Sequence, residues 1–285
     1  MTEQSTYLQQ LQEATSVLRA ALAGRRPVLG LILGSGLGDL ADHVEDAVYI
    51  DYKDVPHFPE STVVGHAGRF VAGRLDGKEV LVMQGRIHFY EGYDMRRVVF
   101  PVYLMHLLGI TALVITNAAG GLNRGYQAGD LMLISDHLNL TGANPLVGPN
   151  HAELGVRFPD MSEAYTRSFR QLAKQLAADV RGTDGETLTL REGVYSGISG
   201  PSYMTPAELT MLARMGGDAV GMSTVAEVVA ASHARMRVLG ISCITDMAIG
   251  DELEPLTHEQ VMATAERAKP KFQALIRAFV RNVEL

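Results

Sequence analysis

The sequence predicts a single α/β domain in which helices surround a twisted β-sheet that is mixed or mostly parallel. Short apolar runs rich in Val, Ile and Leu recur along the chain, and such runs are typical of strands buried on both faces. Stretches with helical periodicity separate several of these runs, and this alternation indicates a sheet wrapped by helices. No linker, repeat or low-complexity tract interrupts the 285 residues, so we expect one domain over 1–285.

The individual elements follow from these patterns in chain order. Strands are expected at 28–33, 79–83, 111–116, 131–134, 194–198, 219–222 and 238–245. Helices are expected at 96–108, 162–178, 206–215, 224–234 and 257–283, after an amphipathic helix within 1–26. The stretch GANPLVGP at 142–149 is typical of a loop. Ligands of open α/β sheets bind beyond the carboxyl ends of strands, so the polar residues that end the apolar runs are the candidate site.

Charge and cysteine content restrict the class of protein. The net charge of −7 argues against a nucleic-acid partner, because phosphate backbones are bound chiefly through Lys and Arg. The single cysteine, Cys243, excludes an intramolecular disulfide and favours a reducing compartment. No apolar run approaches the roughly 18 residues of a membrane span. We therefore expect a soluble, cytoplasmic protein without a membrane partner.

The first candidate motif is GSGLG at 34–38, directly after a predicted strand. Glycines let backbone N–H groups turn toward an anion, and Ser35 adds a hydroxyl donor, so the motif can bind phosphate. A tight turn without a ligand explains the pattern equally well. A dinucleotide-binding motif is disfavoured because its third glycine would fall at Asp39, and the absence of GxxxxGK(S/T) excludes a P-loop.

The second motif brings Arg86, His88, Tyr90 and Glu91 into one short segment after another predicted strand. The planar fork of Arg86 suits phosphate oxygens in bidentate contact, and His88 can share a proton with an oxyanion. Glu91 can hold His88 or bind a hydroxyl group. A surface loop with an Arg–Glu pair explains the charges but not the aromatic residues. A metal site is disfavoured, since neither HExxH nor a cysteine cluster is present.

Further polar residues end the later strands. Asn117 offers a donor and an acceptor beside small residues that permit close approach of a ligand, although a glycine turn is the simpler interpretation. Tyr203 can stack on a flat base or fill the core. On spacing alone, Ser223 fits a helix N-cap better than a phosphate ligand. Asp246 and His258 also fit ordinary roles, as a helix cap and a solvated helical histidine.

Taken in order, these segments resemble the trimeric, low-molecular-mass class of purine nucleoside phosphorylases. The matching segments run along nearly the whole chain in family order, which makes chance agreement an inadequate explanation. They are LGSGLG at 33–38, VGHAGRF at 64–70, QGRIHFYEGY at 84–93, TNAAGGLN at 116–123, HLNLTGANPLVGPN at 137–150, RFPDMSEAY at 157–165, REGVYSGISGPSYMT at 191–205, AVGMSTVAEV at 219–228 and THEQV at 257–261.

The resemblance implies a sheet partly closed as a barrel, a homotrimer, no metal or organic cofactor, and inorganic phosphate as co-substrate. The phosphate ligands would be Ser35, His66, Arg86, His88, the backbone of Ala118, and Ser223. The ribose contacts would be Tyr90, Asn117, Met222 and His258, with Phe158 reaching into a neighbouring subunit's pocket. The base contacts would be Tyr203, Met204 and Asp246, and the residues of catalysis would be His88, Glu91 and Asp246.

The reaction that the resemblance implies splits a purine nucleoside with phosphate into free base and ribose 1-phosphate. Breaking the bond to the base gives an oxocarbenium-like transition state, which bound phosphate stabilises and attacks from the opposite face. A group near N7 must hydrogen-bond or protonate the departing base, and residue 246 is expected to supply it.

The sequence departs from the family pattern at two base-contacting positions. Met204 stands where phosphorylases for 6-oxopurines carry a glutamate, and Asp246 stands where they carry an asparagine. This exchange favours a 6-aminopurine nucleoside such as adenosine, with ribose or deoxyribose left open. One alternative is a 6-oxopurine (inosine or guanosine) phosphorylase in which water or another residue replaces the glutamate. Others are a methylthioadenosine phosphorylase, disfavoured by His258, a nucleoside-binding protein without turnover, and a nicotinamide dehydrogenase.

Overall fold

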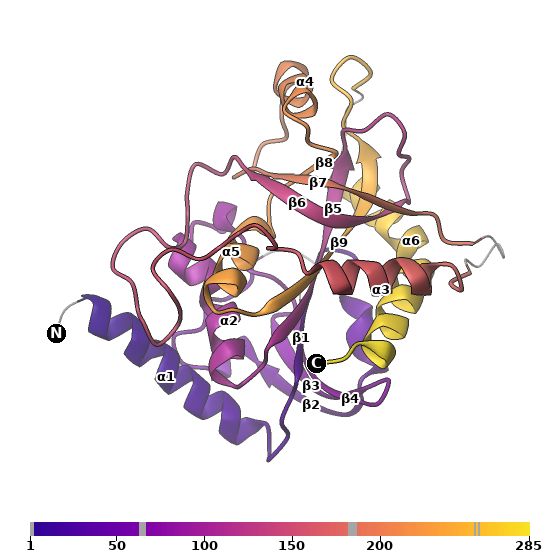
Figure 1. Cartoon of the computed structure of the whole chain (residues 1–285). Helices are drawn as coiled ribbons and strands as arrows, with labels where there is room; N and C mark the ends of the chain where they lie inside the picture. Colours follow the sequence, from indigo (N-terminus) through magenta and orange to yellow (C-terminus); the bar gives the residue numbers. More distant parts are fainter. Residues whose placement is uncertain (1–2, 63–66, 182–186, 254, 256) are drawn as a thin grey trace.

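A mixed β-sheet runs through the centre of the molecule and carries helices on both faces (Figure 1). The computed structural model describes residues 3–62, 67–181, 187–253, 255 and 257–285. Its strands are β1 Leu29–Leu33, β2 Glu45–Asp51, β3 Arg69–Leu75, β4 Lys78–Gln84, β5 Ala112–Gly121, β6 Leu131–Asn139, β7 Leu190–Gly197, β8 Ala219–Gly221 and β9 Arg237–Met247. Its α-helices are α1 Glu3–Ala21, α2 Met95–Leu107, α3 Arg167–Ala177, α4 Pro206–Arg214, α5 Val225–His233 and α6 His258–Asn282.

The strand order combines an open arm with a closed ring. The order is β2-β3-β4-β1-β5-β8-β7-β6-β9, and β9 also pairs in parallel with β5. This extra pairing closes β5, β8, β7, β6 and β9 into a ring. In the arm, β1 is parallel to both β4 and β5, whereas β2, β3 and β4 are antiparallel neighbours. The expected mixed sheet, partly closed as a barrel, is confirmed.

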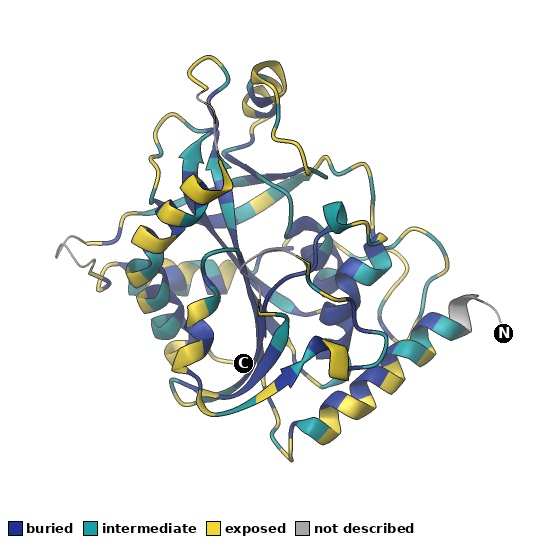
Figure 2. Cartoon of the chain, turned by 180° about the vertical axis from the view of Figure 1, so that it is seen from behind, coloured by how far each residue is buried: buried dark blue, intermediate teal, exposed yellow. Residues whose placement is uncertain are grey.

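Side chains along the central strands point alternately into two hydrophobic cores, which explains why helices cover both faces. On β1, the side chains of Leu29, Leu31 and Leu33 enter one hydrophobic core, while Ile32 enters the other. Helices α3 and α6 pack on the first core, and α2 and α5 pack on the second, with α1 lying outside against α2. Figure 2 shows the buried strands between helices whose outer sides are exposed. Continuous apolar runs are what such two-sided burial requires.

The strands and helices expected from periodicity are present, but several ends differ. Strand β5 continues to Gly121 and β6 continues to Asn139, because both extend into the ring beyond their apolar runs. Helix α3 begins only at Arg167. The expectations missed β2 and β3 altogether. Most of β2 is exposed or half-buried at the edge of the sheet, so its apolar residues form only a short run before Asp51, and charged residues occupy both ends of β2.

Two parallel strand ends bring the first two motifs together. Leu33 at the end of β1 pairs in register with Gln84 at the end of β4, so the segments that follow both strands emerge side by side. Gly34 then passes directly over β5, where an added Cβ would lie 2.7 Å from the Cα of Asn117. Only glycine permits this approach, and the Gly34 N–H donates to Thr116 Oγ1 at 3.0 Å.

Candidate active site

One cavity of about 360 Å³ is lined by most of the residues that the sequence singled out. Those residues are Ser35, Arg86, His88, Tyr90, Asn117, Ala118, Tyr203, Met204, Met222, Ser223, Asp246 and His258. Among the expected residues that the structure describes, two do not line it. Glu91 lies behind His88, Phe158 lies on the surface, and His66 falls outside the described residues. The carboxyl ends of β1, β4 and β8 and the second half of β5 therefore converge on one site.

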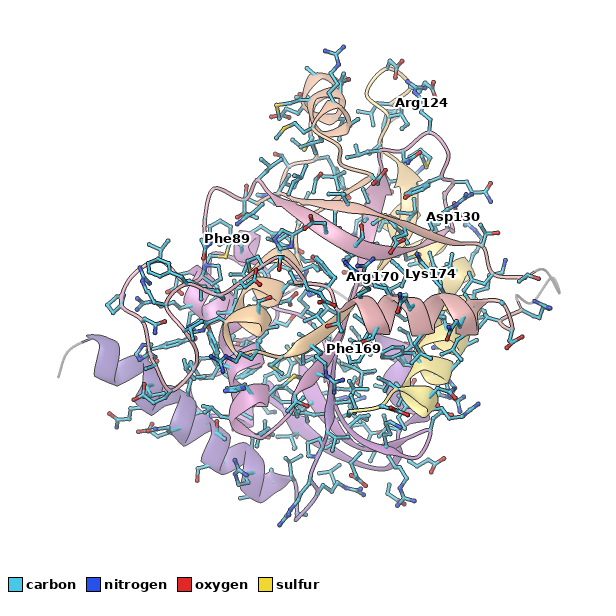
Figure 3. All side chains as sticks on the ribbon, viewed as in Figure 1. Phe89, Arg124, Asp130, Phe169, Arg170 and Lys174 are labelled. Atoms are coloured by element: carbon cyan, nitrogen blue, oxygen red, sulfur yellow. The ribbon has the colours of Figure 1, made fainter. Side chains whose placement is uncertain are left out.

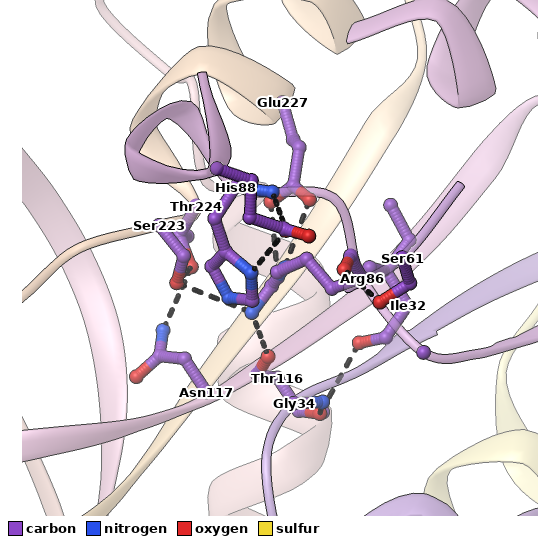
Figure 4. A network of polar contacts seen from close by, with 12 residues as sticks. Ile32, Gly34, Ser61, Arg86, His88, Thr116, Asn117, Ser223, Thr224 and Glu227 are labelled. Carbon is purple, nitrogen blue, oxygen red and sulfur yellow. Dashed lines mark hydrogen bonds and ion pairs between the residues drawn. The ribbon is translucent and has the colours of Figure 1, made fainter. Parts of the chain in front are cut away.

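The polar end of the cavity is built around Arg86, whose side chain is only 1% exposed. Its Nε and Nη2 atoms each donate to the carboxylate of Glu227 at 2.9 Å. Its Nη1 atom donates to the Thr116 carbonyl oxygen at 2.7 Å and to Ser223 Oγ at 3.2 Å (Figure 4). Glu227 thus occupies the Nε and Nη2 edge of the guanidinium, which was expected to bind phosphate oxygens in bidentate contact. The Nη1 side of the guanidinium is the side that lies beside cavity-lining Ser223.

Glu91 holds His88, one of the two roles that its position allowed. His88 donates to Glu91 Oε1 through Nδ1 at 3.1 Å and through its backbone N–H at 2.7 Å. Thr62 donates to Oε2 through its backbone N–H and its hydroxyl, at 2.7 and 2.6 Å. Burial opposes ionisation of Glu91, but the hydrogen bonds from His88 and Thr62 outweigh it and lower the pKa to about 2. The carboxylate therefore fixes the His88 ring, which also stacks on Tyr90 with centroids 4.7 Å apart.

Ser223 does not cap a helix, contrary to the interpretation that its spacing favoured. The N-cap of α5 is Thr224, and its side chain makes no capping hydrogen bond. Thr224 has φ 73° and ψ −50°, and the Val225 N–H donates to the Ser223 carbonyl oxygen at 2.8 Å. These values define a γ-turn of the rare, positive-φ kind. The turn separates Ser223 from the helix and leaves its hydroxyl in the cavity wall.

Another part of the cavity wall is apolar around one carboxyl group. Met204 packs against a small cluster of buried residues, namely Leu122, Ile198, Leu209, Leu212, Val220 and Ala248. Asp246 lies inside β9, one residue before its end, so it caps no helix. Burial raises the pKa of the Asp246 carboxyl, opposed in part by a 2.9 Å hydrogen bond from Thr245 Oγ1 to Oδ1. A neutral acid is therefore more accessible here than on an exposed aspartate.

The mouth of the cavity carries more exposed side chains. Tyr203 is 54% exposed, and His258 is an exposed first residue of α6, as a solvated helical histidine would be. Both nevertheless line the cavity. Phe158 is 87% exposed and contributes nothing to the cavity of its own chain. Its expected role in a neighbouring subunit stays a prediction.

The sequence analysis did not identify the residues that hydrogen-bond to the cavity-lining side chains or to their partners, above all Glu227, Thr224 and Thr62. A signal existed for Glu227, because it is the one charged residue between Val225 and Ser232 in an otherwise apolar helix. Among the described residues, no group of three or more His, Cys, Asp and Glu side chains could hold a metal ion. In the part of the chain that the structure describes, none of the helices has the length and apolar character needed to cross a bilayer.

Comparison with known proteins identifies the family. Residues 28–281 match the model of the phosphorylase superfamily. The chain is 57% identical to purine nucleoside phosphorylase 1 of Geobacillus stearothermophilus, over 90% of this chain and 92% of the relative. It is 46% identical to the purine nucleoside phosphorylase of Mus musculus, over 91% and 90%. The Schistosoma mansoni enzyme, solved with adenosine, superposes with a TM-score of 0.90 at 41% identity, covering 97% of this chain and 98% of that one.

The chain therefore belongs to the phosphorylase superfamily, and it shares its fold with solved purine nucleoside phosphorylases. Within that superfamily it is a purine nucleoside phosphorylase, a pentosyltransferase that carries out phosphorolysis of nucleosides. The readings as a binding protein without turnover and as a nicotinamide dehydrogenase are thereby set aside.

Proposed function

We propose that this phosphorylase favours purine nucleosides whose base carries a 6-amino group, such as adenosine. The observation that carries the proposal is that the half-buried carboxyl of Asp246 lines the same cavity as Met204, which packs on an apolar cluster. No glutamate lines this end among the described residues. Hydrogen-bonding complementarity then decides which purine fits.

A protonated Asp246 matches the N6 and N7 edge of adenine. Its O–H can donate to N7, and its carbonyl oxygen can accept from the 6-amino group. Burial of Asp246, which raises its pKa, supports the protonated form. The same proton can follow N7 as the base departs, so one group both recognises and activates the base.

A 6-oxopurine matches the same end of the cavity poorly. Its O6 and N7 are both acceptors, while a protonated carboxyl has only one proton to offer. Its N1–H would lie against Met204 without a partner. An unpaired buried polar group costs about 1–3 kcal/mol, which corresponds to roughly 5- to 150-fold in kcat/KM.

The other subsites support one arrangement of the reactants. We infer that phosphate binds at the Arg86 and Ser223 end, with Ser35, His88, the Ala118 backbone and, from the resemblance, His66. Ribose would lie between, near Tyr90, Asn117, Met222 and His258. This order puts phosphate and base on opposite sides of the sugar, as in-line attack requires.

The decisive experiment compares kcat/KM for adenosine, inosine, guanosine and methylthioadenosine, each with phosphate, as ribo- and deoxyribonucleosides where available. We expect adenosine to be the best of the four, and Met204→Glu combined with Asp246→Asn to prefer inosine. Met211→Glu is the matched control, because Met211 is 46% exposed on α4 outside the cavity. Wild-type preference for inosine or guanosine by a wide margin would show the specificity argument to be wrong.

We also infer a homotrimer in which Phe158 completes the ribose site of a neighbouring subunit. The 87% exposure of this large apolar side chain supports a partner surface there. A cytoplasmic location is part of the same proposal, supported by the one cysteine, Cys243, which is buried and free.

A further inference from the structure

The turn at Thr224 holds a β-branched residue in a backbone conformation that it rarely adopts. Its φ of 73° lies in the left-handed region, where a β-branched side chain is a genuine outlier. Such strain persists only where the surroundings determine it, and it gathers at functional sites. Thr224 is 1% exposed, so its hydroxyl must find its partners inside the protein.

The Thr224 hydroxyl connects two cavity-lining side chains (Figure 4). Asn117 Nδ2 donates to Thr224 Oγ1 at 2.9 Å. Thr224 Oγ1 lies 3.1 Å from Ser223 Oγ, which accepts from Arg86 Nη1 at 3.2 Å. The result is one chain of hydrogen bonds from Asn117 through Thr224 and Ser223 to Arg86.

The direction of the protons in this chain follows from its two ends. The amide nitrogen of Asn117 and the guanidinium nitrogen of Arg86 can only donate. One hydroxyl proton must therefore lie between Thr224 and Ser223, and the other must point elsewhere. Thr224 is buried with no further side-chain acceptor among the described residues, whereas Ser223 lines the cavity. Thr224 thus donates to Ser223, whose own proton can point toward the cavity or toward the hydroxyl of Tyr195, which also accepts from the Ser223 backbone N–H at 3.3 Å. A bound anion is the stronger acceptor and draws that proton toward the cavity.

The same hydroxyl also orients the amide of Asn117. Because Thr224 donates its only hydroxyl proton to Ser223, its oxygen can only accept from Asn117, so a flipped amide would lose this hydrogen bond. Asn117 is 1% exposed, and its Oδ1 is buried with no hydrogen-bond partner among the described residues. A buried acceptor without a partner is costly unless a ligand supplies the donor. Since Asn117 lines the cavity, a nucleoside hydroxyl or amino group can be that donor.

We propose that Thr224 is a positioning residue whose single hydroxyl makes Ser223 a donor toward phosphate and Asn117 an acceptor toward the nucleoside. The inference rests on the phosphate and nucleoside subsites proposed above. It explains why a strained turn stands at this point, since only this turn places the hydroxyl between the two side chains. It also matches the ligands, because phosphate oxygens accept hydrogen bonds and sugar hydroxyls donate them.

The test separates the hydroxyl from the shape of the residue. Thr224→Val keeps the β-branched outline and removes the hydroxyl, while Thr224→Ser restores the hydroxyl. We expect Thr224→Val to weaken phosphate binding in calorimetry about tenfold and to raise the nucleoside KM. Thr224→Ser is expected to recover affinity to within about threefold. Thr210→Val is the matched control, because the Thr210 hydroxyl bonds only the Pro206 carbonyl oxygen on α4 and should leave phosphate binding unchanged.

A double-mutant cycle gives the outcome that a merely structural role would not produce. In the Ser223→Ala background, Thr224→Val should weaken phosphate binding no further, since the oriented hydroxyl is already absent. Additive losses, or wild-type phosphate affinity in Thr224→Val, would overturn the inference. If Ser223→Ala alone leaves phosphate binding unchanged, the proposed phosphate subsite falls with it. Should Thr224→Val fail to fold, Thr224→Gly relieves the strain at φ 73°, and wild-type phosphate affinity in that variant would equally refute the role.

Discussion

Removal of the Glu227 carboxylate should reveal how much the protein depends on the buried ion pair between Glu227 and Arg86. The side chains of Arg86 and Glu227 are 1% and 5% exposed, and two hydrogen bonds of 2.9 Å join them. Breaking a buried pair from one side leaves an uncompensated charge and costs about 3–5 kcal/mol. With an unfolding entropy of about 2.1 cal/mol/K per residue, 285 residues give about 0.6 kcal/mol/K. Glu227→Ala should therefore lower the Tm by about 5–8 °C.

Phosphate should recover part of this loss. A bound dianion supplies the negative charge that Arg86 has lost, so phosphate is expected to raise the Tm of Glu227→Ala by more than it raises that of the wild type. Differential scanning calorimetry in a buffer free of phosphate and sulfate, with phosphate then added stepwise, measures both effects.

The matched control removes a carboxylate from a more exposed pair. Glu192 is 27% exposed and pairs with Arg170 and Lys174 on α3, both labelled in Figure 3. Pairs of this kind contribute at most about 1 kcal/mol, so Glu192→Ala should shift the Tm by no more than about 2 °C. Equal destabilisation by Glu227→Ala and Glu192→Ala would refute the reasoning, as would a phosphate response in Glu227→Ala no larger than that of the wild type.

Two further predictions concern Asp246 and Phe158. Burial raises the pKa of folded Asp246, so its stabilising contribution is complete in acid and is lost as the pH rises through the folded pKa. Asp246→Asn should therefore be more stable than the wild type at neutral pH, and this difference in stability should vanish at pH values below the usual pKa of an aspartate. Thermal unfolding measured across pH tests the prediction. A difference in Tm that does not change with pH would contradict it. If Phe158 completes a neighbour's site, light scattering should report a trimer, and Phe158→Ala should raise the KM for the nucleoside. Tyr49 is a half-exposed aromatic residue on β2, and the control variant Tyr49→Ala should leave this KM unchanged. A fully active monomer would exclude the shared site.

The sequence alone determined most of the elements of this fold, because the periodicity of apolar residues is a local property. The run at 28–33 identified β1, and the pattern over 257–283 identified α6 almost to its ends. The resemblance to purine nucleoside phosphorylases, which the sequence carries, indicated which motifs line the cavity, whereas spacing alone left most of them open to ordinary structural roles. The edge strand β2 was not predicted, because a half-exposed strand mixes apolar with charged residues and does not form the long apolar run of a buried strand.

Only the tertiary structure decided how the site residues are held. Glu227 meets Arg86 across 141 residues of chain, and Thr224 meets Asn117 across 107. Neither contact has a local signature, because each depends on β8 pairing with β5 to close the ring and on the turn that begins α5. Spacing therefore favoured an N-cap for Ser223 and a bidentate phosphate contact for Arg86. The physical reason is that hydrogen bonds between distant segments follow from strand order, which the pattern of apolar residues along the chain does not specify.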